Sequence, residues 1–210
     1  MAKQKFYVVW KGKNPGIYST WSECQKQIKE FEGAIFKSFP NKDIAEKAFN
    51  GNYEEFIGKD KHFSSLSQEE LKLIGKPIQD SLSVDAACAG NPGVMEYQGV
   101  DTKCGARLFH LGPFPEGTVN IGEFLALVHG LGYLKQRNSK IPVYTDSITA
   151  ISWVKKKKVN TKLKKTKKNE KLFDLVDRAL IWLNNNKYEN KIIKWETTAW
   201  GEIPADFNRK

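Results

Sequence analysis

The chain has 210 residues, of which 40% are hydrophobic and 28% charged, and its formal net charge is +10. This composition is typical of a globular protein of one or two domains. No apolar run reaches the roughly 20 residues of a membrane helix, and the first residues lack the apolar region of a secretory signal. We therefore expect a cytoplasmic protein with no membrane partner. The positive charge favours a polyanion such as nucleic acid, although charge can also serve solubility alone.

Cysteines and histidines indicate little chemistry of their own. The three cysteines are odd in number and fit no zinc motif, which indicates free thiols in a reducing compartment. The three histidines are too scattered along the chain to indicate a Ser–His or Cys–His nucleophile.

Residues 1–52 form the first predicted unit. Strands over 5–10 and 17–19 flank a turn rich in glycine, asparagine and proline, which indicates a hairpin. The elements expected next are a helix capped by Ser22, a strand over 34–39 and a short helix capped by Asn41. The result is a small ββαβα domain, close to the size at which a core alone is marginal.

A linker is predicted over residues 53–79. This stretch has no clean hydrophobic periodicity and mixes glycine, serine and proline with a short helical patch over 68–73.

Residues 80–210 form the larger predicted domain. The expected elements are strands over 81–87, 93–101 and 105–111, a helix over 122–136, a strand over 141–145, helices over 147–155 and 170–184, and a final strand over 191–195. Three strands in a meander followed by helical crossovers predict an α/β fold with a mixed sheet and flanking helices.

Four acids in this domain are candidate site residues. Asp85 stands inside an apolar strand, where a carboxylate is costly unless it is paired or binds a metal. The alternative is an exposed residue at the end of the strand. Glu123 opens a helix and could instead form a capping box with Asn120 as the N-cap. Asp146 follows a strand and could be an N-cap, and Asp206 alone could be a surface acid.

Together, these acids favour a metal site. Asp85, Glu123 and Asp146 fall at a strand, a helix start and a strand end that could meet at one edge of the sheet. Like charges at close range raise one another's pKa and repel, and a cation resolves the conflict. Mg²⁺ prefers oxygen ligands, and two such ions can clamp the attacking and leaving oxygens of phosphoryl transfer.

The motifs around these acids are specific. VDAACAGNPG, TVNIGEFLAL, VYTDS and WGEIPADFNRK occur in this order in residues 81–210, and the set resembles the ribonuclease H family, particularly its compact bacterial members. The resemblance implies a ribonuclease H-like mixed five-stranded sheet and hydrolysis of the RNA strand of an RNA–DNA hybrid, leaving 5′-phosphate and 3′-hydroxyl ends. It implies two Mg²⁺ ions, with Mn²⁺ as a substitute. It assigns them to Asp85, Glu123, Asp146 and Asp206, and gives Glu202 an auxiliary catalytic role.

The same resemblance implies contacts with the nucleic acid. The matching positions are Gly90, Asn91, Thr118, Asn120, Thr161 and Lys194. Groups near the first aspartate and the helix would read ribose 2′-hydroxyls, which distinguish RNA from DNA, while Thr118, Asn120 and Thr161 would hold a phosphate of the DNA strand. Ile148 stands where close relatives have an amide side chain, so one RNA contact is absent.

A lysine-rich segment, residues 155–171, contains ten lysines and one acid. A solvated face is the alternative interpretation, but so many like charges repel one another and favour a polyanionic partner. Lysines of this kind could follow a phosphate backbone without reading its sequence.

The N-terminal stretch from FYVVWKGKNPGIYSTW to AIFKSF resembles the hybrid-binding domain that precedes many ribonucleases H and is related to a viral inclusion-body protein domain. The resemblance implies that Tyr7, Trp21, Phe36 and Lys37 contact the DNA strand. Ser38 replaces the second lysine of the family motif. From core packing alone, Tyr7 and Phe36 could equally be buried.

Two other functions remain open at this point. The chain could be a non-catalytic binding module, or an integrase-type nuclease on the same fold. No obligate protein partner is evident, and we expect a monomer.

Overall fold

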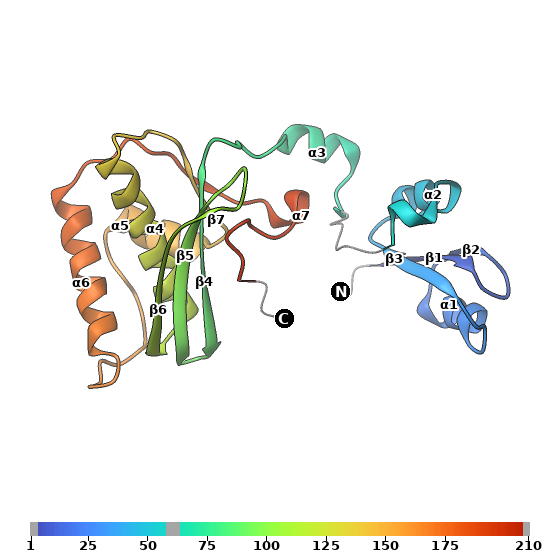
Figure 1. Ribbon diagram of the computed structural model, residues 1–210, viewed down its shortest axis with the longest axis horizontal. Helices are drawn as coiled ribbons and strands as arrows, with labels where there is room; N and C mark the ends of the chain where they lie inside the picture. The colour runs from blue at the N-terminus through green and yellow to red at the C-terminus, as the bar shows by residue number, and fades with distance from the viewer. Residues whose placement is uncertain (1–3, 58–63, 208–210) are drawn as a thin grey trace. The chain divides into compact units, whose positions relative to one another are not determined.

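The structure is a computed structural model that describes residues 4–57 and 64–207. It divides into two compact units, Met1–Gly75 and Lys76–Lys210, each of which is considered by itself (Figure 1). Among the described residues, no helix has both the length and the apolar composition needed to cross a membrane.

The first unit is a three-stranded antiparallel sheet with the strand order β2-β1-β3. Its elements are β1 (Phe6–Lys11), β2 (Gly16–Tyr18), α1 (Trp21–Ile28), β3 (Ile35–Phe39), α2 (Lys42–Asn50), the 3₁₀ helix η1 (Tyr53–Glu55) and α3 (Gln68–Ile74). The predicted ββαβα order is confirmed. Val8 and Phe39 pack against Ala45 and Ala48 of α2, which gives the sheet a small apolar core.

The start of α1 differs from the prediction. Thr20, not Ser22, is the N-cap, and it forms a capping box with Glu23. The Glu23 amide donates to the Thr20 hydroxyl at 3.3 Å, and the Thr20 amide donates to the Glu23 carboxylate at 3.1 Å. This reciprocal pair satisfies two donors at the helix start. Trp21 therefore becomes the first residue of the helix.

The second unit is built on the predicted mixed five-stranded sheet, with the order β6-β5-β4-β7-β8. Its elements are β4 (Leu82–Gly90), β5 (Gly93–Asp101), β6 (Arg107–Gly117), α4 (Val119–Gln136), β7 (Val143–Thr145), α5 (Ile148–Lys156), α6 (Glu170–Asn185), β8 (Ile192–Lys194) and α7 (Thr197–Trp200). The first three strands pair antiparallel, and β4, β7 and β8 pair parallel. Helices α4, α5 and α6 pack beside the sheet (Figure 1).

Helix α4 forms the centre of the core and lies very close to the sheet. Residues such as Phe124, Leu127 and Leu131 are fully buried against β4 and β5. At Gly122, an added Cβ would lie 2.7 Å from the Cβ of Ala86 and 2.7 Å from the sulfur of Met95. Only glycine allows this approach, and it brings the neighbouring Glu123 towards β4.

Two boundaries were predicted wrongly. Strand β6 runs to Gly117 instead of ending at Leu111, and it contains Pro113 and Pro115. Proline is tolerated there because β6 is an edge strand, where a missing amide donor costs no ladder bond. Helix α4 begins at Val119 instead of Gly122, so its first turn includes Asn120 and Glu123.

Candidate active site

Three carboxylates from separate parts of the chain converge at the sheet. Asp85 lies within β4, Glu123 in the first turn of α4, and Asp146 directly after β7. Each offers an oxygen, and these oxygens lie within 4.8 Å of one another. Three hard oxygen donors this close suit a divalent cation, which would offset their mutual repulsion.

The electrostatics of Asp85 reflect its position inside the sheet. The pKa of the Asp85 carboxyl is raised to about 8, chiefly by burial; a backbone hydrogen bond at Ala86 lowers it, and the charges of the nearby carboxylates contribute to the rise. A carboxyl with this pKa is mostly protonated at neutral pH unless a positive charge is brought to it. Asp85 is half-buried, so the exposed strand-end alternative does not describe it.

Glu123 is not the second half of an Asn120 capping box. The N-cap of α4 is Thr118, and Asn120 is a helical residue in the first turn. The Glu123 carboxylate instead accepts a hydrogen bond from the Ser147 side chain, across the site. The pKa of Glu123 is raised to about 7, chiefly by burial; the hydrogen bond from Ser147 lowers it and the charge of Asp146 contributes to the rise.

Asp146 is not a helix cap either. The cap of α5 is Ser147, whose hydroxyl accepts a hydrogen bond from the Ala150 amide at 3.1 Å. Burial raises the pKa of Asp146, the neighbouring Lys194 lowers it, and Asp206 raises it. Its Oδ1 atom is buried and has no hydrogen-bond partner among the described residues. A residue whose carboxylate lies close to two others, and which has a buried oxygen without a partner among the described residues, fits a metal ligand better than a structural cap.

Asp206 stands near this group but not within it. It lines a cleft of about 430 Å³ together with Asp85, and its charge raises the pKa of both Asp85 and Asp146. Glu202 is exposed, between the buried residues Gly201 and Ile203. The structure therefore brings three of the four predicted ligands close together, with Asp206 beside them, whereas Glu202 is exposed and no described contact links it to the acids.

The segment that carries Asp206 has two supports that the sequence did not reveal. The Gln98 amide, from β5, donates to the carbonyl of Ala205 at 2.7 Å, and the Trp195 indole N–H donates to the carbonyl of Gly201 at 2.7 Å. Gln98 pairs with Asp85 in the β4–β5 register. A glutamine at an ordinary strand position carries no sequence signal for this role, because its partner is 107 residues away.

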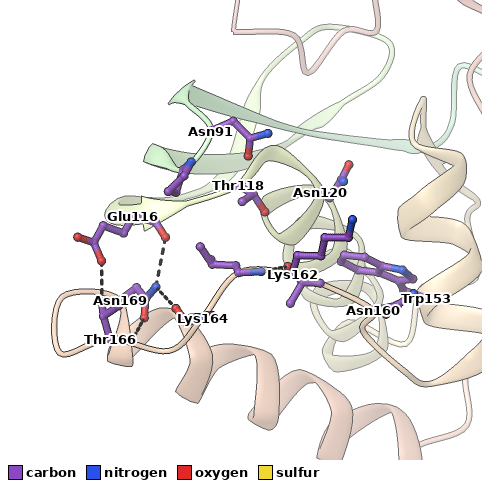
Figure 2. A pocket seen from close by; sticks show the side chains of 13 residues that line it. Asn91, Glu116, Thr118, Asn120, Trp153, Asn160, Lys162, Lys164, Thr166 and Asn169 are labelled. Carbon is purple, nitrogen blue, oxygen red and sulfur yellow. Dashed lines mark hydrogen bonds between the residues drawn. The ribbon is translucent and has the colours of Figure 1, made fainter.

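Four of the six nucleic-acid contacts predicted in the second unit line a neighbouring pocket of about 670 Å³ (Figure 2). Asn91, Thr118 and Asn120 line one side, and Thr161 lies on the segment that lines the other. The Thr118 side chain makes no cap hydrogen bond to the helix, so its hydroxyl is available to a ligand. Gly90 ends β4 next to Asn91, with a φ of +107° that favours glycine.

The lysine-rich segment forms part of this pocket. All ten of its lysines are exposed, and Lys162 and Lys164 line the pocket itself. Within the described part of the chain, Lys165 pairs with Asp174 at 3.2 Å and Lys168 pairs with Glu116 at 3.5 Å. The remaining lysines face solvent next to a site bordered by amides and hydroxyls.

In the first unit, three predicted contact residues form an aromatic cluster. The Trp21 ring lies 5.6 Å from Tyr7 and 5.9 Å from Phe36, measured between ring centroids. Trp21 is 45% exposed and Phe36 39% exposed, so Phe36 is not buried packing. Lys37 lies elsewhere, because neighbouring strand residues point to opposite faces. Its ammonium donates to the carbonyl of Phe56 at 2.8 Å, on the face covered by the apolar core.

Part of the first unit matches a known protein family. Residues 5–49 match the protein-family model described as the ribonuclease H1 N-terminal domain. That segment contains the three residues of the aromatic cluster.

Individual relatives agree with this match. The chain is 57% identical to the ribonuclease H of Crithidia fasciculata over 37 residues (18% of this chain, 8% of that protein). It is 34% identical to the ribonuclease H of Saccharomyces cerevisiae over 99 residues (42% and 28%) and 42% identical to human ribonuclease H1 over 87 residues (41% and 30%). These alignments span less than a third of each relative. The resemblance to ribonuclease H1 with its N-terminal domain is thus confirmed.

The chain is also similar to solved structures of proteins named RNase H1. The chain is similar to LC11-RNase H1, isolated from compost by a metagenomic approach, with a TM-score of 0.36 and 20% identity over 55% of this chain and 82% of that one. It is also similar to RNase H1 from Halobacterium salinarum, with a TM-score of 0.37 and 19% identity over 55% and 83%.

Proposed function

We propose that this chain is a ribonuclease H, an endonuclease that hydrolyses the RNA strand of RNA–DNA hybrids. The observation that carries the proposal is the convergence of Asp85, Glu123 and Asp146 within 4.8 Å, with a buried oxygen of Asp146 unpartnered among the described residues. The match of residues 5–49 to the ribonuclease H1 N-terminal domain supports the choice of substrate.

The metal site would take two Mg²⁺ ions, with Mn²⁺ as a substitute. Asp85, Glu123 and Asp146 would hold them, with Asp206 completing the set. When bound, the metals supply a water nucleophile and charge stabilisation for the leaving oxygen. The products would carry 5′-phosphate and 3′-hydroxyl ends. Glu202, which is exposed, would have an auxiliary role in the reaction.

Residues of this chain would bind both strands of the hybrid and so position it. Gly90, Asn91 and Asn120 would face the ribose hydroxyls of the RNA strand, whose presence marks RNA. Thr118, Asn120 and Thr161, which all line the 670 Å³ pocket, would hold a phosphate of the DNA strand. Lys194 lies beside Asp146 and would contact the scissile region.

Three segments of the chain would have separate functions. Residues 1–52 would bind the hybrid, residues 53–79 would act as a linker, and residues 80–210 would carry out catalysis. A tethered binding domain raises the local substrate concentration without changing the chemical step. We propose a monomer located in the cytoplasm, with no obligate protein partner.

The test is cleavage of an end-labelled RNA–DNA hybrid with Mg²⁺, next to double-stranded RNA and double-stranded DNA controls. Cleavage confined to the RNA strand of the hybrid supports the proposal. Binding without cleavage would instead identify a non-catalytic module, and cleavage of double-stranded DNA would indicate an integrase-type nuclease.

Trp21→Ala is expected to weaken hybrid binding by about 5- to 150-fold, because one stacked aromatic residue is worth roughly 1–3 kcal/mol. Maximal cleavage at saturating hybrid should be unchanged, since the aromatic cluster holds no acid of the metal site. The measurement is fluorescence anisotropy with a labelled hybrid, followed by steady-state kinetics. Phe31→Ala is the control, because Phe31 is also an exposed aromatic residue of the first unit but lies outside the cluster. Equal affinities for the two variants would contradict the binding role.

Changing Lys158, Lys162 and Lys164 to glutamine is expected to flatten the salt dependence of hybrid binding. Each phosphate that the protein no longer neutralises should reduce the slope of log K against log salt by about 0.9, the value for B-form DNA. A variant with Lys103, Lys187 and Lys191 changed to glutamine has the same net charge and keeps the segment intact. If both variants show the same slope, the lysine-rich segment is only a solvated surface.

A further inference from the structure

The pocket beside the acids has one wall on a long irregular loop. The loop, residues 157–169, joins α5 to α6 and contains neither helix nor strand. It carries most of the lysine-rich segment, and mutual repulsion between these charges should drive it away from any fixed position. In the structure it nevertheless lies against the end of β6 and lines the pocket opposite Thr118 and Asn120 (Figure 2).

Asn169 holds this loop in place. Its side chain is only 1% exposed, and it makes hydrogen bonds in three directions. The amide nitrogen donates to the carbonyl of Lys164 at 3.0 Å and to the carbonyl of Glu116 at 3.4 Å, and the amide oxygen accepts from the Thr166 amide at 2.8 Å. A single buried side chain therefore ties the loop both to itself and to β6, as Figure 2 shows.

A second contact uses the side chain of Glu116. The Thr166 hydroxyl donates to the Glu116 carboxylate at 2.7 Å, and the Lys168 ammonium lies 3.5 Å from it. An acid on the rim of a pocket for phosphate would ordinarily repel the ligand. Here the carboxylate is engaged by the loop, so it fastens the lysines next to the pocket and its repulsive effect is reduced.

We infer that Asn169 is a positioning residue for nucleic-acid binding: with Thr166 and Glu116 it clasps the 157–169 loop onto β6 and thereby builds the lysine wall of the phosphate pocket before substrate arrives. This inference rests on the proposed function and adds a residue to it. Because the loop is already ordered, binding of the hybrid does not carry the entropic cost of ordering it. The hydrogen bonds of the Asn169 side chain join the loop to β6 and do not involve the three acids or Thr118.

The test compares Asn169→Ala with a matched control, Asn190→Ala. Asn190 is also buried, and its amide nitrogen bridges two carbonyls, those of Ser139 at 2.9 Å and Ile141 at 2.8 Å. It lies at the end of the parallel strands opposite Asp146, ahead of β8. Both variants should lose thermal stability. Only Asn169→Ala should weaken hybrid binding, by about tenfold in Kd measured in EDTA, because three backbone partners lose their hydrogen bonds and the wall is released.

Steady-state kinetics and substitutions of Thr166 distinguish a binding role of the clasp from a purely structural one. Asn169→Ala should raise KM for the hybrid by a similar factor while kcat changes by less than about twofold, since the metal site is intact. Thr166→Val should reproduce part of the increase, and Thr166→Ser, which keeps the hydroxyl donor, should restore the wild-type KM. If Asn169→Ala and Asn190→Ala have equal Kd and KM values, the clasp is merely structural and the inference is wrong. If the wild-type chain neither binds nor cleaves the hybrid, the proposed function fails instead.

Discussion

Replacing Asp146 with asparagine should lower the rate of hybrid cleavage by at least about a thousandfold. A carboxylate oxygen of Asp146 lies within 4.8 Å of ligand atoms of Asp85 and Glu123, and its Oδ1 is buried with no partner among the described residues, so asparagine removes a negative charge from the centre of the site. Loss of several kcal/mol of metal-dependent stabilisation of the transition state corresponds to that factor. The fold should persist, since Asp146 makes no helix cap.

The same variant should bind the hybrid nearly as well as wild type. The substitution leaves unchanged the aromatic cluster, the 670 Å³ pocket and the lysine-rich segment. Cleavage rates in Mg²⁺ and hybrid affinities in EDTA should be measured for both proteins. Asp80→Asn, which changes an exposed acid just before β4, is the control and should cleave normally. Mg²⁺-dependent cleavage by Asp146→Asn near the wild-type rate would refute the metal assignment.

Asp85→Asn is expected to stabilise the protein at alkaline pH when no divalent metal is present. In the folded chain the pKa of Asp85 is about 8, well above its ordinary value of 3.8. Between these two values the folded state binds more protons than the unfolded state. The stability of the wild type therefore falls as pH rises through this window. The variant does not titrate there, so its advantage should be absent near pH 4 and complete above pH 8.

Thermal melts from pH 4 to pH 9 in EDTA measure this effect. Each kcal/mol should shift Tm by roughly 2–8 °C across the size range of single domains. Mg²⁺ should then stabilise the wild type at pH 8, because it binds only the folded acidic site, and should have little effect on the variant. Asp177→Asn, at an exposed position of α6, is the control. Identical pH profiles for Asp85→Asn and the wild type would show that the buried carboxyl does not destabilise the metal-free fold.

The order of secondary structure could be read from the sequence because it depends on local patterns. Alternating and helical periodicities, with turn residues between them, place both the ββαβα unit and the mixed sheet. The ends of elements were less certain, since they depend on tertiary context. Residues such as Pro113 look like the end of a strand until β6 is known to be an edge.

The sequence by itself also determined which acids deserved attention, because Asp85 interrupts an apolar strand and its motif occurs with three others in order. It could not decide between a capping and a metal-binding role for Glu123 or Asp146, since both roles place an acid at the start of a helix. Tertiary structure decided this: Thr118 and Ser147 take the caps, and Gly122 lets α4 approach β4 closely.

Some residues have roles that depend on contacts between distant parts of the sequence. The tie between Gln98 and the Asp206 segment joins residues 107 positions apart, and the Asn169–Glu116 clasp joins residues 53 positions apart. Likewise, Phe36 and Lys37 are neighbours in sequence but lie on opposite faces of β3. Periodicity and motifs report what a residue does within its own element. Contacts across such distances arise from packing, which only the tertiary structure determines.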